Sequence, residues 1–138
     1  MSCCKQVIPD MIERGSGNII ILGATGSLRG GANFAAFASA KNAQRALAES
    51  MARHLGPKGR AWPFPSILKF VYLNFSIFEL QGIHVTLLII DGSIDAERTG
   101  EEKWIKAENL ADTLYFITKQ DKSAWTFTMD VRPFVEKW

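Results

Sequence analysis

The sequence predicts an α/β domain built on a parallel sheet with helices on both faces. Two runs of apolar, largely β-branched residues, 17–23 and 83–90, are typical of buried strands. Between them, residues 34–55 repeat apolar side chains at helical spacing, and a further helix and an alternating strand follow near the C-terminus. Because strands that alternate with helices are joined by right-handed crossovers, this order places the strands in one parallel sheet.

The composition is that of one ordinary globular domain. Of 138 residues, 47% are hydrophobic and 22% are charged, so we expect a single domain over residues 1–138. The 16 basic and 14 acidic residues form no basic block, which argues against nucleic-acid and membrane partners. The N-terminus carries charged residues and no long apolar core, so no secretory signal is predicted. Cys3 and Cys4 are neighbours that rarely bridge each other, and a reducing, cytoplasmic location is expected.

The first half of the chain predicts a helix, a strand and a long helix. Residues 6–14 have helical spacing, and Pro9 limits them to a short helix or to the end of a longer one. Residues 17–23 place four consecutive apolar residues between glycines, which predicts a strand buried on both faces. A loop of small residues, 24–33, then leads to the helix at 34–55.

The long helix at 34–55 has an expected start, an expected end and an apolar face. Asn33 is a candidate N-cap, and residues 56–59 contain the Gly and Pro that commonly end a helix. Eight alanines between Ala35 and Ala52 favour the helix and let another helix approach closely. The residues expected on the apolar face are Phe37, Ala40, Ala43 or Gln44, Leu47, Met51 and Leu55.

Residues 60–82 interrupt the alternation of helices and strands. They are rich in aromatic residues and stand where connections are usually about 4–6 residues long. Their apolar part is broken by charged and polar residues and is too short to predict a membrane span; it could form an extra strand, an interfacial helix or a poorly ordered segment. Since Gly59 and Ile83 would join in a natural helix-to-strand turn, we interpret residues 60–82 as an insert, such as a retained non-coding segment in frame.

The second half of the chain predicts strand, loop, helix and strand. The β-branched run at 83–90 is the second strand, and the loop 91–95 follows it. A helix is expected over residues 106–118, and residues 123–131 alternate like a strand. The side chains expected to face inward from the helix are Leu110, Leu114 and Ile117, and those expected on one side of the last strand are Trp125, Phe127, Met129 and Val131.

The segment "GGANFAAFASAK", residues 30–41, places Phe37 four residues before Lys41 and so on one face of the long helix. Around it, "GNIIILGATGSLRGGANFAAFASAKNAQRALAESMARHLGPKG" resembles the fifth strand, active-site loop and catalytic helix of the short-chain dehydrogenase/reductase superfamily. "GIHVTLLIIDGSID" resembles its sixth strand and the loop beyond, and "LYFITKQDKSAWTFTMDVRPFVEKW" is similar to the seventh strand and C-terminus of a subgroup. The resemblance implies the C-terminal portion of a Rossmann-like doubly wound parallel sheet, with about three strands and three helices and without the N-terminal nucleotide-binding half.

The resemblance also implies roles for three positions. Family members place a Tyr four residues before a Lys, and the Tyr moves a proton to or from the substrate oxygen while a nicotinamide accepts or gives hydride. The Lys lowers the pKa of that Tyr and hydrogen-bonds the nicotinamide ribose. Here Lys41 matches the Lys, Phe37 stands at the Tyr position, and Ala24 stands thirteen residues earlier, where a Ser orients the substrate oxygen. Thr25 and Ser27 are near enough in sequence to be imperfect substitutes for that Ser.

The cofactor implied by the resemblance is NAD or NADP. In the family, the loop after the sixth strand holds the cofactor's carboxamide; here Gly92 and the backbone of Ile94 match that loop, whereas its usual Pro and Thr are replaced. The implied cofactor-binding positions are therefore Lys41, Gly92 and Ile94. The glycine-rich turn that binds the pyrophosphate has no counterpart, since the glycines in residues 23–31 form no G-x-x-x-G-x-G pattern.

Each of these residues also has a plainer interpretation. Phe37 could be a core or interface aromatic on an alanine-rich helix, and Lys41 a solvated or snorkelling lysine. His54 and His84 are far apart in the chain and have no partner cysteines or spaced carboxylates, so no metal site is predicted. The two aspartates of residues 91–95 are interpreted as a cap or turn pair before the next helix rather than as acid–base residues.

Two functions of different classes follow from these observations. The first is a truncated NAD(P)-dependent oxidoreductase acting on a small alcohol or carbonyl, whose activity would need another proton route, such as water near Thr25 or Asp91. The second is a catalytically inactive fragment that acts as a subunit-association module. Self-association is expected through the helix at 34–55 and the C-terminal strand, by which family members pair. The unpaired edge of the strand at 17–23 is a further template for association.

Overall fold

The structure of the chain is a computed structural model that describes residues 2–56, 82–95 and 102–137. Helices and strands alternate in it as the apolar pattern predicts. The elements, in chain order, are α1 (Ser2–Glu13), β1 (Gly17–Ala24), the 3-10 turn η1 (Thr25–Ser27), α2 (Ala35–Leu55), β2 (Ile83–Ile90), β3 (Ile94–Asp95), β4 (Ile105–Lys106), α3 (Ala107–Thr118), the 3-10 turn η2 (Lys122–Ala124) and β5 (Thr128–Val131). The predicted fold class is confirmed: the described residues form an α/β arrangement around a parallel three-stranded sheet.

The main sheet has the strand order β1-β2-β5. β1 and β2 are parallel and pair along their whole length, from Gly17 opposite Ile83 to Ala24 opposite Ile90. β5 pairs with the last four residues of β2, so β2 is the central strand, and seven of its eight residues are buried. In the sheet that the described residues form, β1 lies at an edge and is partly buried. The expectation that this strand is buried on both faces is therefore wrong, because an edge strand has a neighbour on one side and its helices cover it incompletely.

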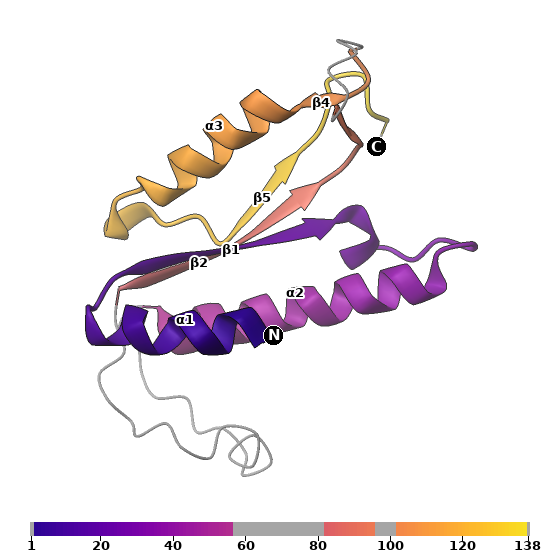
Figure 1. The fold of residues 1–138 in the computed structure, drawn as a ribbon. Helices are drawn as coiled ribbons and strands as arrows, with labels where there is room; N and C mark the ends of the chain where they lie inside the picture. Colours follow the sequence, from indigo (N-terminus) through magenta and orange to yellow (C-terminus); the bar gives the residue numbers. More distant parts are fainter. Residues whose placement is uncertain (1, 57–81, 96–101, 138) are drawn as a thin grey trace.

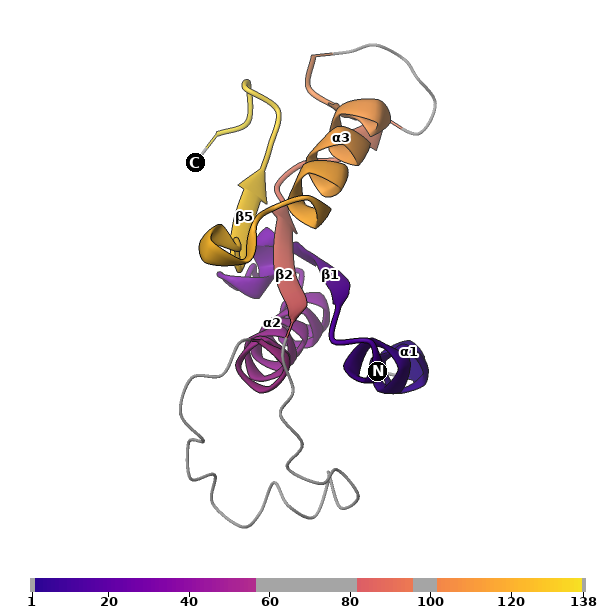
Figure 2. The same ribbon diagram turned by 90° about the vertical axis from the view of Figure 1, so that its left-hand side faces the viewer.

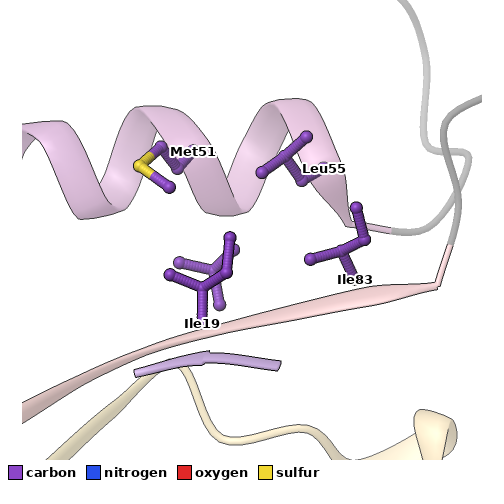
Figure 3. Packing of buried hydrophobic residues seen from close by; sticks show 5 residues of the cluster. Ile19, Met51, Leu55 and Ile83 are labelled. Atoms are coloured by element: carbon purple, nitrogen blue, oxygen red, sulfur yellow. The ribbon is translucent and has the colours of Figure 1, made fainter. Parts of the chain in front are cut away.

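Helices α1 and α2 lie side by side on the lower face of the sheet, and α3 lies on the upper face (Figures 1 and 2). On the lower face, Met51 and Leu55 of α2 point toward Ile19 of β1 and Ile83 of β2 (Figure 3). α1 adds half-buried apolar side chains to the same cluster. Burying each large apolar side chain contributes about 1.5–3 kcal/mol, so this cluster helps to attach both helices to the sheet.

The upper face is covered by α3 as the sequence predicts. Leu110 and Ile117 are buried there against Leu88, and Leu114 packs beside them. Leu110, Leu114 and Ile117 follow the helical repeat, so one stripe of α3 meets the sheet. The inward positions predicted for this helix are confirmed.

The two N-terminal helices begin at residues other than those predicted. α1 extends over Ser2–Glu13 instead of 6–14, and Pro9 lies inside it. Because proline has no N–H, the helix lacks one backbone hydrogen bond there, and the region is the end of a longer helix. α2 begins at Ala35, and its N-cap is Phe34, which makes no side-chain capping bond, so the N-cap predicted at Asn33 is wrong.

The apolar face predicted for α2 is confirmed in its C-terminal half, where Met51 and Leu55 are buried and Leu47 packs beside them, but it is wrong in its N-terminal half. Ala38 and Ala48 are buried, whereas Phe37 is 48% exposed. Ala48 packs with Leu87 and Ile89 of the central strand. The small side chains let the helix backbone approach the sheet closely, so the alanines, rather than the first aromatic residue, turn toward the core.

The C-terminal strand is shorter than predicted and does not place all its apolar residues on one side. Residues Lys122–Ala124 form η2, and β5 covers Thr128–Val131 alone. Phe127 packs with the cluster that includes α2, whereas Met129 and Val131 pack with the α3 cluster. Because the extended geometry begins after Phe127, the alternation assumed for residues 123–131 fails there.

A buried polar network ties the central strand to the segment before β5. Thr86 Oγ1 donates a hydrogen bond to the backbone oxygen of Thr126 at 2.8 Å. His84 Nε2 lies 2.9 Å from that oxygen and 2.9 Å from Thr86 Oγ1, so we assign Nε2 as a donor to both. The ring of Trp125 stacks on His84, with centroids 4.8 Å apart. These contacts give His84 a structural role.

The predicted insert at 60–82 lies outside the described residues except for Gly82. This glycine has φ +94° and lies too close to the carbonyl of Gly15 for any side chain to fit. Among the described helices, none is long and apolar enough to cross a membrane.

Candidate functional site

The carboxyl edge of the sheet gathers the positions that the sequence singles out. Ala24 ends β1 directly opposite Ile90, the last residue of β2. η1 and the loop after β2 therefore leave the sheet at the same edge, and the start of α2 lies beneath it (Figure 1). In open α/β sheets this edge is where ligands bind, so it is the candidate functional site.

Phe37 lies in the first turn of α2 against the loop that follows β1. A Cβ on Gly26 would lie 2.9 Å from Cε1 of the Phe37 ring. Only a glycine therefore lets η1 approach the helix this closely without moving the ring. The ring is half exposed at the edge of this contact.

Lys41 lies one turn further along α2 on the same side as Phe37. Its Nζ atom is 5.8 Å from the centre of the Phe37 ring, within the range of a cation–π contact. The same atom donates a hydrogen bond to the backbone oxygen of Leu22 at 3.1 Å. The structure thus brings the two predicted positions together and anchors the ammonium group to β1.

Asn42 is a residue of this region that the sequence analysis did not single out. Its Nδ2 atom donates to the backbone oxygens of Gly26 and Ala38, at 3.0 Å each. The side chain therefore holds η1 against α2. The sequence signal that could have identified Asn42 was a polar side chain directly after Lys41, near the helix start that follows the loop.

The position predicted to orient a substrate oxygen has no hydroxyl. Ala24 ends β1, and its backbone oxygen accepts a hydrogen bond from Ser27 Oγ at 2.7 Å. Ser27 is fully buried in this turn. Its hydroxyl is used to close η1 and is not exposed to a substrate, so Ser27 does not replace the missing Ser. Thr25 lies beside it, and its backbone oxygen accepts the N–H groups of residues 28 and 29.

Gly92 and Ile94 lie in the loop that follows β2. Gly92 has φ +142°, which L side chains rarely adopt, and a Cβ there would lie 2.9 Å from Cδ of Pro133. Ile94 is the first of the two residues of β3 and pairs with Ile105 of β4. The loop is therefore held by the C-terminal segment on one side and by a two-residue ladder on the other.

Asp91 forms an ion pair instead of the cap or turn predicted for it. Its carboxylate lies 3.1 Å from NH1 of Arg132, a contact that is not aligned as a hydrogen bond. NH2 of Arg132 also contacts Asp130 at 2.9 Å. Asp91 is buried where β2 ends and Arg132 follows β5, so the pair ties the ends of the two strands together. Asp95 lies in β3 and does not cap α3, whose N-cap is Lys106; a turn role for Asp95 stays a prediction.

The metal-binding side chains of the described residues form no cluster. In residues 2–56, 82–95 and 102–137, no three His, Cys, Asp or Glu side chains are placed to hold a metal ion. The charged group beside the Phe37 ring is instead the ammonium group of Lys41. The arrangement can bind a hydroxyl or an anion through Lys41, and Phe37 offers an apolar ring in place of an acidic hydroxyl.

Comparisons with known proteins match this arrangement to one family. Residues 1–60 match the family model described as short chain dehydrogenase. The crystal structure of short-chain dehydrogenase from Rhodopseudomonas palustris matches with 35% sequence identity and a TM-score of 0.59. The match covers 94% of this chain and 44% of that one, so the present chain spans less than half the length of that relative. No curated protein matches the chain.

The sequence match and the structural match agree with the fold. The parallel order β1-β2-β5, with helices on both faces, is a part of a Rossmann-like sheet. The identity of 35% extends over almost the whole chain rather than over one motif. The chain therefore belongs to the short-chain dehydrogenase/reductase superfamily.

Proposed function

We propose that this chain is the catalytic-helix portion of an oxidoreductase that uses NAD or NADP on an alcohol or carbonyl compound, in a form that lacks a proton-transferring side chain. The observation that carries the proposal is the pair of Phe37 and Lys41 at the carboxyl edge of the sheet. Lys41 Nζ lies 5.8 Å from the centre of the Phe37 ring. The ring has no hydroxyl that this charge could make more acidic.

The missing hydroxyl matters because hydride transfer from an alcohol carbon must be accompanied by loss of the hydroxyl proton. A phenol can take and return this proton, whereas the benzyl ring of Phe37 cannot. Ser27 is bonded to the backbone of Ala24, and Asp91 is paired with Arg132. Neither side chain is placed to take over the transfer, which supports a chain that binds at this edge without completing the reaction.

The described residues fit the nicotinamide end of the cofactor. When bound, NAD or NADP supplies the group that accepts or gives hydride. Lys41 has three N–H donors, and one of them is used on Leu22, so a ribose hydroxyl can receive another. Gly92 and the backbone of Ile94 would hold the carboxamide. The sequence has no G-x-x-x-G-x-G turn for the pyrophosphate, so this chain would contribute mainly to one end.

Titration of the purified chain with NADH and NADPH, followed by fluorescence and calorimetry, tests the proposal. We expect saturable binding with a Kd in the micromolar range. Lys41→Met should weaken it by about tenfold or more, because a charge-assisted hydrogen bond is lost. Lys5→Met is the matched control, since Lys5 is exposed on α1, and should leave binding unchanged. Binding that is absent or in the millimolar range would refute the proposal.

The chemical part of the proposal is tested separately with Phe37→Tyr. The wild-type chain should give no change in nicotinamide absorbance with a panel of small alcohols and carbonyls. Phe37→Tyr restores a phenol beside Lys41 and should give measurable turnover, whereas Phe37→Leu should not. Turnover by the wild-type chain equal to that of Phe37→Tyr would contradict the assigned defect.

A subunit-association module is the second candidate, supported by exposed apolar side chains on the elements expected to pair. Phe34 at the start of α2 is 64% exposed, and Phe134 beyond β5 is also exposed. Sedimentation equilibrium over a range of concentrations tests this function. Phe34→Ser should weaken self-association, whereas Tyr115→Ser, an equally exposed aromatic on α3, should not. A wild-type chain that stays monomeric at high concentration would exclude self-association.

A further inference from the structure

Two segments leave the carboxyl edge of the sheet side by side, one after β2 and one after β5. Ile90, the last residue of β2, lies opposite Val131, the last residue of β5. Asp91 and Arg132 are therefore each the first residue beyond their strand. The backbone N–H of Asp91 donates to the oxygen of Val131 at 2.9 Å, so the pairing continues one residue past β2. The loop 91–95 thus begins beside the C-terminal segment.

The guanidinium of Arg132 contacts two carboxylates at this point. Its Nη1 atom lies 3.1 Å from Asp91, and the two side chains are only 16% and 9% exposed. Its Nη2 atom donates a hydrogen bond to Asp130 at 2.9 Å, and the Asp130 side chain is 32% exposed. A buried ion pair adds little to stability compared with apolar residues of the same volume. The effect that remains is on position, because the pair fixes where Asp91 lies relative to β5.

Gly92 and Ile94, the positions assigned above to the cofactor's carboxamide, follow Asp91 directly in this loop. Gly92 has φ +142° and lies against the ring of Pro133, since a Cβ there would be 2.9 Å from Cδ of that ring. The N–H of Ile105 donates to the oxygen of Ser93 at 2.9 Å, and Ile94 pairs with Ile105. The course of this backbone is therefore set by the C-terminal segment on one side and by β4 on the other.

We propose that Arg132 is a positioning residue for the nicotinamide end of the site: through Asp91 it holds the loop 91–95 in the shape that takes the carboxamide. The inference rests on the proposed function. Without the guanidinium, the carboxylate of Asp91 would be buried without its cation and would turn toward water. Because Asp91 directly precedes Gly92, this turn would carry the backbone of the loop with it. Arg132 itself is assigned no contact with the cofactor.

Amide hydrogen exchange of the chain without cofactor, followed by NMR, tests whether Arg132 holds the loop. In Arg132→Met, the amides of Asp91 and Ile105, which are bonded on the two sides of the loop, should exchange at least about tenfold faster. The amide of Leu87, which donates to Phe127 at the other end of the β2–β5 pair, should stay within about threefold of wild type. Equal acceleration at all three amides, or none at Asp91 and Ile105, would overturn the proposal.

Ligand preference tests whether the loop serves the carboxamide, with NAD and an analogue in which hydrogen replaces the carboxamide as the two probes. By calorimetry, the wild-type chain should bind NAD about tenfold more tightly than the analogue. Asp91→Asn should reduce this ratio to below about threefold, because the contact with Arg132 is not aligned as a hydrogen bond and depends on charge. Asp130→Asn is the matched control and should keep the ratio, since its amide oxygen can still accept the hydrogen bond from Nη2.

The ratio of the two affinities separates positioning from a general structural role, because a loss of folded protein weakens both ligands equally. Thermal unfolding checks that the variants fold, and Asp91→Asn remains informative where Arg132→Met does not fold, since it leaves no buried carboxylate without its cation. A wild-type ratio in Asp91→Asn, with NAD still bound, would overturn the positioning role and leave the proposed function standing. A wild-type chain that binds neither probe would refute the proposed function, and the positioning role with it.

Discussion

Leu55 is the last residue of α2, and its side chain is 2% exposed between that helix and the sheet. It points toward the strands beside Met51, and Ile19 and Ile83 complete the cluster (Figure 3). Leu55→Ala removes the contact that holds the C-terminal end of the helix to β1 and β2. We expect this single change to lower the free energy of unfolding by about 3 kcal/mol.

The magnitude follows from the burial of Leu55. The substitution removes three carbon groups, and each buried carbon contributes about 0.8 kcal/mol, which gives about 2.4 kcal/mol. The cavity that remains adds to this, and buried Leu→Ala changes cost about 2.7–5 kcal/mol in total. Because Leu55 lies at a helix end, where neighbours can relax, the lower part of this range applies. With a urea dependence of about 2 kcal/mol per molar, the unfolding midpoint should fall by about 1.5 M.

Urea unfolding followed by circular dichroism measures this change, with Leu28→Ala as the matched control. Leu28 is 55% exposed, so the same chemical change should cost less than about 0.5 kcal/mol there. Ile83→Val is a milder change in the same cluster, with an expected cost of about 1 kcal/mol, and remains measurable where Leu55→Ala does not fold. A cost for Leu55→Ala no larger than that for Leu28→Ala would refute the packing of α2 on β1 and β2.

Two further predictions concern the loops. Gly92→Ala should lower the free energy of unfolding by about 1–3 kcal/mol, because φ is +142° and a Cβ would lie 2.9 Å from Pro133. Gly30→Ala, where no atom lies within 4 Å of the added carbon, should leave the thermal midpoint unchanged, and equal midpoints for the two variants would contradict the packing of Gly92. The hydroxyl of Ser123 and, to a smaller extent, its backbone N–H donate hydrogen bonds to Asp121 and lower the pKa of that carboxyl. The stability that Asp121 contributes is therefore fully present above the unfolded-state pKa near 4. It is lost as the pH falls through the lower folded-state pKa. Asp121→Asn should flatten the acid side of the thermal midpoint's pH profile, and a profile identical to that of the wild type would count against the bond.

Local patterns predicted the sheet and the helix above it well. The runs at 17–23 and 83–90 are strands within one residue of their predicted bounds, and they pair in parallel. Leu110 and Ile117 face the core as their helical spacing predicts. Apolar periodicity is a property of neighbouring residues, so it can be read without knowledge of the rest of the chain.

Features that depend on the neighbouring element were predicted less well. The 17–23 run was predicted to be fully buried, yet it is the edge strand of the described sheet, because a strand's own sequence does not say how many strands flank it. Phe37 belongs to the apolar repeat of α2 but is half exposed, because the helix packs on the sheet through Ala38 and Ala48. The pairing of Asp91 with Arg132 joins residues 41 positions apart, a contact that no local pattern encodes.

The candidate site was also predicted in part from local spacing and in part only seen in the structure. The spacing of Phe37 and Lys41 placed both on one helix face, and the structure has them together. The bonds from Lys41 to Leu22 and from Asn42 to Gly26 came from the tertiary structure, because they depend on how closely η1 lies against α2.

The sequence by itself determined the order of helices and strands, the parallel sheet and the residues that carry the family resemblance. The tertiary structure alone decided that β1 ends the described sheet, that Lys41 bonds the backbone of Leu22, and that Asp91 pairs with Arg132. The physical reason is the range of the forces involved. Periodicity and turn chemistry act between neighbours in the chain, whereas register, edge exposure and ion pairing are set by which distant segments meet.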